Sequence, residues 1–583
     1  MHKTLKAETA QPLLPVPQSK SFRARLLVQA QVVFLVATGF LLTLTPSAPF
    51  TKELGVCESG AVRDVLAGNI ILPRFVPGPI VHVPPLYWWI AAICVKAVGW
   101  SELALRLPSL IAAALTCAIV FAWSGRTLGP SVGLWSAVAL LLCHFFLDAA
   151  RQPRMDSMLA LFVTAAAVSL ERAIAAWAQA KRHAIWYFVA AACAIGLGAL
   201  TKGILGIMLP GLVVALFLLI RGRFVELFHF DMAATFAAGL AIGLVWFLAG
   251  YQLGGRPFLE WQVRMNLWSR FIPAGAGGAG YCAHPFWYFV PQILSGFLPW
   301  SLYLPSFALA AWPVGGRRLP EPVVYALCWF IALFIFFSSS HGKCLIYILP
   351  AFPPLAILTG WVIAEVQGGF DTRRWVKQLC TAGSAIIAVG TALMVIAAML
   401  VIDCGVPAKI ALRLHPTDRR FLELLVRQAF DPLLLLWAGF SLVGAGLIVR
   451  GLLRAAPTFE TYGTLVIAAA GGWFWFAVMN PALAQGETLK TFARQAAASV
   501  PADASISHFG LGDCELNFYS PRPLEPISQI SCVEHAAAEQ YIIIRKQDFN
   551  AIPSMRRACF VTELAATPND SIGPRLLIRQ TRP

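Results

Sequence analysis

Long apolar segments, repeated along most of the chain and separated by short basic clusters, restrict what this sequence can fold into. A helix needs about twenty apolar residues to span a bilayer. The chain is 58% hydrophobic and only 13% charged, whereas roughly a quarter of the residues in soluble domains are charged. The sequence therefore predicts an all-α polytopic membrane protein. Its thirteen candidate transmembrane segments are 26–46, 104–124, 131–149, 156–177, 185–201, 203–220, 231–250, 286–312, 322–338, 345–365, 378–402, 432–449 and 461–479.

The basic clusters predict how the chain crosses the membrane. The net charge is +16, but the basic residues lie in short groups between apolar segments, a pattern typical of membrane topology rather than of nucleic-acid binding. If every cluster is cytoplasmic, the N-terminus lies inside and the C-terminus outside. Residues 48–125 can then cross only once, so we expect 85–99 to lie on the membrane or dip into it. The clusters occupy 125–129, 178–184, 221–224, 315–318, 371–377 and 450–454.

The two ends of the chain differ from the apolar region, 26–479, which contains a first outer loop over 48–103. Residues 1–25 read as a disordered basic cytoplasmic tail. Residues 480–583 combine helical spacing with strand-like runs, "QYIIIRK" and "RLLIRQ", and predict a small outer α/β domain. Cys514 and Cys532 would lie in an oxidising compartment there and could form a disulfide.

This topology places a set of polar residues on the outer side of the membrane, at or near membrane depth. Charges in that position are costly and often mark a site. Each residue also has an alternative interpretation without a role in catalysis. Glu58 could be a solvated loop charge, and Asp156 could be neutralised by Arg151 and Arg154 as an interfacial anchor. The candidate site residues are Glu58, Asp156, Lys202, Lys343, Tyr347, Arg264 and Arg270.

The chemistry of this set suggests sugar transfer from a lipid-linked phosphate. Lysine and arginine bind phosphate oxygens and stabilise a departing phosphate. A carboxylate beside them can accept the proton of an attacking hydroxyl. The glycine-rich stretch 275–280 lies in a long loop with no strand before it, so it is not expected to cradle a nucleotide.

Several motifs carry a resemblance to a known family. They are "LAGNIILPRF", "PPLYWWIAAICVKAVGWSELALRLPSLIAA", "RMDSMLALF", "LTKGILGIMLPGL", "HPFWYFVPQILSGFLPW" and "FFSSSHGKCLIYILPAFPPLAIL". In this order, over about 26–365, the chain resembles bacterial GT-C glycosyltransferases of the aminoarabinose lipid A transferase and protein O-mannosyltransferase group. The resemblance implies the GT-C fold with about thirteen transmembrane helices, three juxtamembrane helices in the first outer loop and an outer C-terminal domain.

The resemblance also implies roles for individual residues. It makes Glu58 the principal catalytic carboxylate and Asp156 a second acid, with Lys202 and Lys343 facing the donor phosphate and Tyr347 nearby. We expect Arg264 and Arg270, in the outer loop 251–285, to contribute to phosphate binding. The implied donor is an undecaprenyl-phosphate-linked sugar in the bacterial inner membrane.

The sequence departs from the family pattern at three places. The usual Asp-Glu pair of the first loop is reduced to Glu58, and Val83 replaces a lysine before the juxtamembrane helix. The outer-loop histidine is displaced to "YCAHPF". The sequence predicts no cofactor with certainty. The alternative is a divalent metal ion bound by His82, Cys282 and His284.

Two other functions stay open at the level of sequence. A transporter or lipid flippase also places charges inside a helical bundle, although no matching inverted halves are evident here. A catalytically impaired relative is the other alternative, because of the missing acid and lysine. The main prediction is a membrane glycosyltransferase that binds membrane lipids and no nucleic acid. It would act on a lipid, glycan or protein acceptor, with the sugar and the acceptor both undetermined by the sequence.

Overall fold

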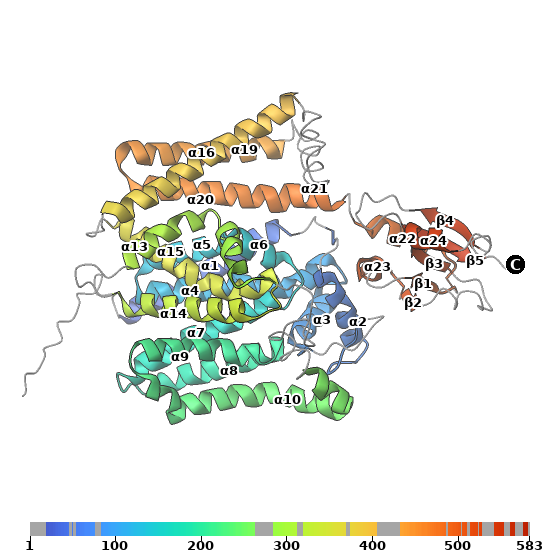
Figure 1. The fold of residues 1–583 in the computed structure, drawn as a ribbon, viewed down its shortest axis with the longest axis horizontal. Coiled ribbons are helices and arrows are strands. Elements are labelled where there is room, and N and C mark those ends of the chain that lie inside the picture. Colours follow the sequence, from blue (N-terminus) through green and yellow to red (C-terminus); the bar gives the residue numbers. More distant parts are fainter. Residues whose placement is uncertain are drawn as a thin grey trace, which may run out of the picture.

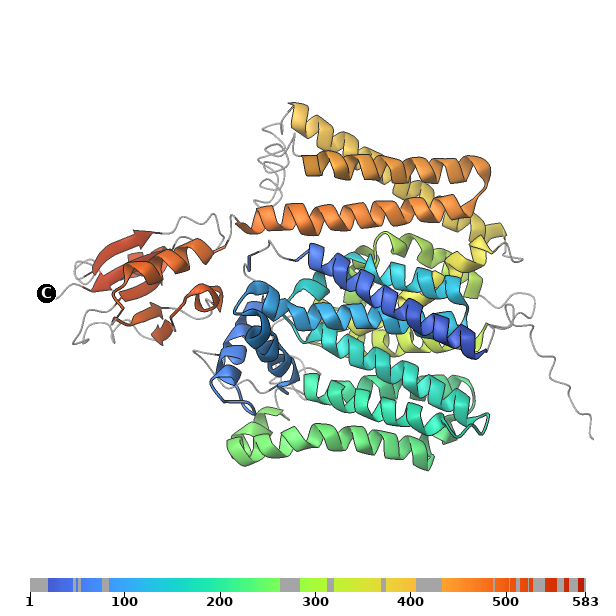
Figure 2. The same cartoon turned by 180° about the vertical axis from the view of Figure 1, so that it is seen from behind.

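The structure is a computed structural model, shown as a ribbon in Figures 1 and 2. The residues that it describes are 19–45, 49–50, 54–75, 83–262, 284–311, 319–368, 374–404, 432–485, 488–502, 504–509, 514–522, 524–527, 541–552, 560–565 and 575–580.

Ten helices in the described residues are long and apolar enough to cross a membrane. One of them begins with a 3₁₀ segment, and another contains a π segment between two α-helices. They are α1 (Lys20–Thr43), α4 (Glu102–Thr127), α7 (Asp156–Trp177), α8 (Ala184–Lys202), α10 (Phe230–Trp261), α14 (Glu321–Ser339), η7 with α15 (Leu345–Ala351, Phe352–Gln367), α16 (Arg374–Cys404), α19 (Pro432–Arg454), and α20 with η8 and α21 (Pro457–Trp473, Phe474–Met479, Asn480–Gln485).

Two bent pairs and one shorter helix account for the other predicted segments. The pair α5 (Pro130–Leu141) and α6 (His144–Arg151) is bent by 62°. The second pair is bent by 107°. Its first arm, Phe286–Gly296, consists of η5 (Phe286–Tyr288) and α12 (Phe289–Gly296), and its second arm, Trp300–Ala311, consists of η6 (Trp300–Tyr303) and α13 (Leu304–Ala311). The shorter α9 (Leu205–Ile220) is followed by η2 (Phe224–Phe228). Each of the thirteen predicted segments coincides with one of these elements, so the predicted fold class is confirmed.

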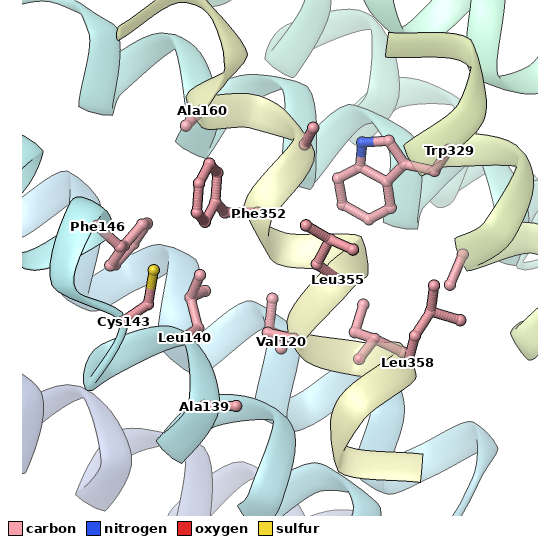
Figure 3. Packing of buried hydrophobic residues seen from close by; sticks show 14 of the residues in the cluster. Val120, Ala139, Leu140, Cys143, Phe146, Ala160, Trp329, Phe352, Leu355 and Leu358 are labelled. Carbon is pink, nitrogen blue, oxygen red and sulfur yellow. The ribbon is translucent and has the colours of Figure 1, made fainter. Parts of the chain in front are cut away.

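The centre of the bundle is a packed apolar core around α15, whose membrane span is 94% buried. A helix that is apolar on all sides must be surrounded by other helices, and α15 is. Figure 3 shows Phe352, Leu355 and Leu358 of α15 among side chains from α4, α5, α6, α7 and α14 and from the α5–α6 bend. These neighbours are Val120, Ala139, Leu140, Cys143, Phe146, Ala160 and Trp329.

The outer layers of the bundle expose apolar surface. Helices α16, α19 and α20 form one flank, and α8 and α10 form the other (Figures 1 and 2). Only 22% of the α10 span and 39% of the α19 span is buried, and large apolar side chains such as Val245 and Val443 are exposed. Such a surface suits contact with lipid chains, so this is a multi-pass membrane protein.

The first loop holds three short helical elements. They are η1 (Leu54–Cys57), α2 (Glu58–Leu66) and α3 (Leu86–Val98). Helix α3 has 13 residues, too few to span a bilayer, which agrees with a helix lying on the membrane. The indole N–H groups of Trp89 and Trp246 donate to the carbonyls of Ile70 (2.6 Å) and Ile71 (2.8 Å) and hold the segment after α2 against α3 and α10.

The C-terminal region is an α/β domain, as the strand-like runs predict. Its five strands follow the order β2-β1-β3-β5-β4, with β1 parallel to β2 and β3, and β5 antiparallel to β3 and β4. In the central strand, Tyr541 and Ile543 pack on one face while Ile542 and Ile544 pack on the other. The elements are α22 (Lys490–Ser499), β1 (Ile506–Phe509), α23 (Cys514–Tyr519), β2 (Leu524–Ile527), β3 (Tyr541–Arg545), α24 (Lys546–Ala551), β4 (Phe560–Ala565) and β5 (Arg575–Gln580).

Three details differ from the sequence prediction. The disulfide of Cys514 is formed with Cys57 of the first loop, so the suggested pairing with Cys532 is wrong; Cys532 itself lies outside the described residues. Helix α1 begins at Lys20 rather than at residue 26, because the Ser19 hydroxyl accepts the Phe22 amide (3.1 Å) and caps it. The last apolar helix continues to Gln485, past the predicted boundary at 480.

Candidate active site

A cavity of about 500 Å³ lies beside the first loop, at the ends of α7 and α8. Most of its wall is apolar and is formed by α8, α9, α10 and α14. Its polar side chains gather in one region and come from segments that are far apart in the sequence. They are Glu58, Arg154, Asp156, Lys202, Gln262, Ser340 and Tyr347.

Asp156 is the centre of a charged cluster in this cavity. Its side chain is only 4% exposed. The Arg154 guanidinium donates to Oδ2 at 3.2 Å, and the Lys202 ammonium donates to Oδ1. Asp156 is also the first residue of α7, where the helix dipole favours a negative charge. A buried carboxylate between two cations leaves the cluster with one net positive charge, which suits an anionic ligand.

The turn after α8 determines where the Lys202 side chain lies. Helix α8 ends at Lys202 because Gly203 adopts φ 64°, a conformation that favours glycine. Two further glycines let α8 and α9 approach closely, since a Cβ at Gly206 would lie 2.0 Å from the carbonyl carbon of Gly198. This backbone contact holds the turn so that Lys202 points back to Asp156. Its ammonium also lies 4.9 Å from the centre of the Tyr347 ring.

Glu58 is half-buried at the first position of α2, where it faces α3. The fully buried Trp88 donates its indole N–H to Glu58 Oε2 at 3.2 Å. Burial is the main cause that raises the pKa of Glu58 to about 8; Arg154 acts in the opposite direction and Asp156 in the same one. A carboxylate with a raised pKa, lining a cavity beside cations, is typical of a proton-transfer group.

The structure gives Tyr347 and Lys343 different surroundings. Tyr347, in η7, lines the cavity. Lys343 is 3% exposed, and its ammonium donates to the carbonyls of His284 (2.8 Å) and Ser340. Burial lowers the pKa of this ammonium. Lys343 therefore shapes the backbone next to the cavity, and its direct contact with a phosphate stays a prediction.

Other predicted site residues fall outside the part of the chain that the structure describes. These are Arg264 and Arg270, together with His82 and Cys282 of the suggested metal site. His284 is described, is exposed, and stacks on Tyr288 with ring centres 4.0 Å apart. Among the described residues, no three His, Cys, Asp or Glu side chains gather as a metal would require.

Sequence reasoning missed two members of the site. The sequence assigns Arg154 only a neutralising role, but it lines the cavity, acts to lower the pKa of Glu58 and donates to Asp156. Trp88 was not singled out, although "PPLYWW" places it next to a turn in the first loop. The signal for Arg154 is its position two residues before Asp156, an acid at the start of a helix. A partner for Glu58 could not be read from spacing, because Trp88 belongs to another helix.

Apolar side chains from three helices form the wall of the cavity next to the charged cluster. Ile204, Leu205 and Met208 come from the start of α9, Leu244 and Phe247 from α10, and Phe336 from α14. This wall adjoins the charged cluster, so one ligand could place a long apolar chain against the helices and an anionic head at the cations.

Comparisons with known proteins show which proteins this chain resembles in sequence and fold. A family model described as dolichyl-phosphate-mannose-protein mannosyltransferase matches residues 82–249. Among solved structures, ArnT from Cupriavidus metallidurans bound to undecaprenyl phosphate superposes with a TM-score of 0.70, 19% sequence identity and coverage of 96% of this chain and 98% of that chain. Its apo state gives a TM-score of 0.69. The chain has the GT-C fold. The resemblance inferred from the sequence motifs is thereby confirmed.

Curated relatives show the same similarity at the level of sequence. An undecaprenyl phosphate-alpha-4-amino-4-deoxy-L-arabinose arabinosyl transferase of Pseudomonas aeruginosa is 30% identical over 346 residues, 59% of this chain and 60% of the relative. A second transferase with this name, from Proteus mirabilis, is 30% identical over 299 residues, 50% of this chain and 52% of the relative. The chain thus matches about 60% of the length of the first of these relatives.

Proposed function

We propose that this protein is a membrane glycosyltransferase that moves a sugar from undecaprenyl phosphate to an acceptor on the outer face of the bacterial inner membrane. The observation that carries the proposal is the cavity, in which a half-buried carboxylate and a cationic cluster adjoin a long apolar wall. The ArnT structure with the same fold was solved with undecaprenyl phosphate, and the curated relatives are named for a sugar carried on that lipid.

The donor would bind with its two ends in different environments. The polyprenyl chain would lie against α9, α10 and α14, and the phosphate would lie near Lys202 and Arg154. Both cations already share Asp156, so they are held in place before the donor arrives. Preorganised cations stabilise the charge that develops on a leaving phosphate.

Transfer would proceed by attack of an acceptor oxygen on the anomeric carbon. The bond between that carbon and the phosphate oxygen breaks, and undecaprenyl phosphate leaves with the bonding electrons. Where the acceptor is a hydroxyl, its proton passes to the Glu58 carboxylate. An acceptor that is itself a phosphate needs no base, and Glu58 then positions groups by its charge alone.

The direct test uses purified protein in lipid nanodiscs with undecaprenyl-phosphate-linked aminoarabinose and lipid A. We expect glycosylated lipid A and free undecaprenyl phosphate in equal amounts, both measured by mass spectrometry. A flippase would leave the donor intact, so an unchanged donor with every acceptor class (lipid A, glycan and protein) would contradict the proposal. An assay with a second sugar on the same lipid identifies the sugar specificity.

The proposed orientation gives a separate prediction. With the C-terminal domain outside, Asn550→Cys in α24 should react in intact cells with a membrane-impermeant maleimide. Lys181→Cys, in a predicted cytoplasmic cluster, should react only after the cells are opened. Both positions are exposed in the structure, and the unsubstituted protein gives the background. The opposite labelling pattern would contradict the proposed orientation, because it would mean that the C-terminal domain and the cavity lie on the cytoplasmic side.

A further inference from the structure

The segment Cys514–Ser520 of the C-terminal domain, here called the latch, contacts the first loop on both sides of Glu58. Cys514 forms a disulfide with Cys57, the residue directly before Glu58. Later in α2, the Arg63 guanidinium donates to the carbonyls of Phe518 (3.4 Å) and Ser520 (3.0 Å). The latch thus holds both ends of the helix that begins with the candidate base.

More contacts connect the latch to the rest of the first loop. The Trp100 indole donates to the Phe518 carbonyl at 3.1 Å and stacks on the Phe518 ring. The Tyr519 hydroxyl donates to Glu102 Oε1 at 3.1 Å and accepts the Phe50 amide at 2.6 Å. The latch therefore reaches from the segment before α2 to the first turn of α4.

Helix α2 cannot hold Glu58 in place by itself. It has nine residues, and no side chain caps its N-terminus. Isolated helices of this length are unstable in water, so α2 depends on its neighbours. Those neighbours are α3, which supplies Trp88 to the Glu58 carboxylate, and the latch on the other side. Breaking the covalent bond at Cys57 leaves the Arg63 contacts near the end of α2, but it frees the backbone next to Glu58, whose carboxylate is then held by Trp88.

We propose that the Cys57–Cys514 disulfide positions the Glu58 carboxylate for catalysis, so that sugar transfer is fast only in the oxidised protein. This inference rests on the proposed function. Cys57 and Cys514 are positioning residues, because they touch neither donor nor acceptor and act through α2. Both residues are half-buried, so we expect a small reductant to reach the bond in the folded protein.

Loss of the bond should also change how activity depends on pH. The charged and titratable groups around Glu58 are Arg154, Asp156 at the start of α7, Lys202 at the end of α8, and Tyr87 on α3. The pKa of Glu58 is about 8 because protein atoms exclude water from the carboxyl. A loosened α2 admits water, so this pKa falls toward 4.5, and the rise of activity with pH moves to lower pH.

The experiment compares four samples in nanodiscs: oxidised wild type, wild type reduced with a phosphine, reduced wild type after reoxidation, and the Cys57→Ala/Cys514→Ala variant. We expect reduction to lower kcat about tenfold, less than the roughly 10²-fold that a 1 Å misplacement can cost. Donor KM should stay within about twofold. Reoxidation should restore kcat. The double variant should match the reduced protein and be insensitive to the phosphine, which controls for the other cysteines.

Hydrogen exchange provides a readout that does not depend on activity. Reduction should accelerate amide exchange in Glu58–Leu66 while leaving α7 and α8 unchanged. Equal kcat, pH profile and α2 exchange in oxidised and reduced wild type would overturn the positioning role. A lower melting temperature with unchanged kcat and pH profile would also overturn it, since that result indicates a purely structural bond. If oxidised wild type transfers no sugar to any acceptor class, the proposed function fails first and this inference fails with it.

Discussion

Replacing Glu58 with glutamine should reduce sugar transfer to a hydroxyl acceptor by about 10²–10⁴-fold, the usual contribution of a general base. The amide keeps the size of the side chain and can still accept the Trp88 indole hydrogen bond seen at 3.2 Å. It cannot accept a proton. The loss should appear in kcat, with donor KM little changed, because the phosphate is bound by other residues. Rates are measured in nanodiscs at saturating donor.

The pH profile gives this prediction a second measurement. In wild type, kcat should increase as pH rises through about 8, since Glu58 has a raised pKa and accepts a proton only when ionised. The glutamine variant should lack this increase. Aspartate at the same position is the matched control: it keeps the charge but shortens the side chain, so it should retain a pH-dependent rise at reduced rate. Near-normal turnover of Glu58→Gln would show that this side chain does not act as the base and serves only a structural role through Trp88.

Replacing Lys202 with methionine should weaken donor use by about 10- to 150-fold in kcat/KM, the equivalent of losing one charge-assisted hydrogen bond of about 1.5–3 kcal/mol. The structure adds a consequence, because Lys202 also pairs with the buried Asp156. Methionine leaves that carboxylate with its ion pair to Arg154, at 3.2 Å. The variant should therefore also melt at a lower temperature.

A double variant separates the two effects of this substitution. In Lys202→Met/Asp156→Asn the uncompensated carboxylate is gone, so thermal stability should recover toward that of wild type. Donor use should stay low, because the Lys202 ammonium is no longer available for the phosphate. Full recovery of activity together with stability would mean that Lys202 serves only to neutralise Asp156. Arg154→Met, which removes the other cation paired with Asp156, tests whether loss of either cation has the same effect.

The sequence predicted the membrane-spanning part of this fold well, because apolar segments of about twenty residues have few alternatives to helices in a bilayer. It was less informative about how those helices are broken. The 62° bend between α5 and α6 leads to the short segment that carries Arg154, and no hydrophobic count distinguishes a bent span from a straight one. A hydrophobic count also cannot locate a helix end that is set by a capping side chain. This is why α1 begins after Ser19, earlier than the predicted start at residue 26.

The candidate site was only partly predictable. Glu58, Asp156 and Lys202 could be grouped because topology places them on one side of the membrane, and the cavity does bring them together. The direction of the Lys343 side chain toward backbone carbonyls could not be foreseen, because it depends on the turn around Ser340. The partner of Cys514 was beyond sequence reasoning as well, since a disulfide requires two Cα atoms close in space, here 4.8 Å apart, across 457 residues of sequence.

That separation sets the order of events during biosynthesis. At about 5–20 residues per second, the ribosome needs roughly 20–90 s to proceed from Cys57 to Cys514. During this interval the first loop has already emerged, while its covalent partner has not been made. A nascent or prematurely terminated chain would thus carry the donor cavity without a fixed base beside it. Under the proposed topology, the protein would become fully competent only after its last domain has been exported and oxidised, which would delay sugar transfer until assembly is complete.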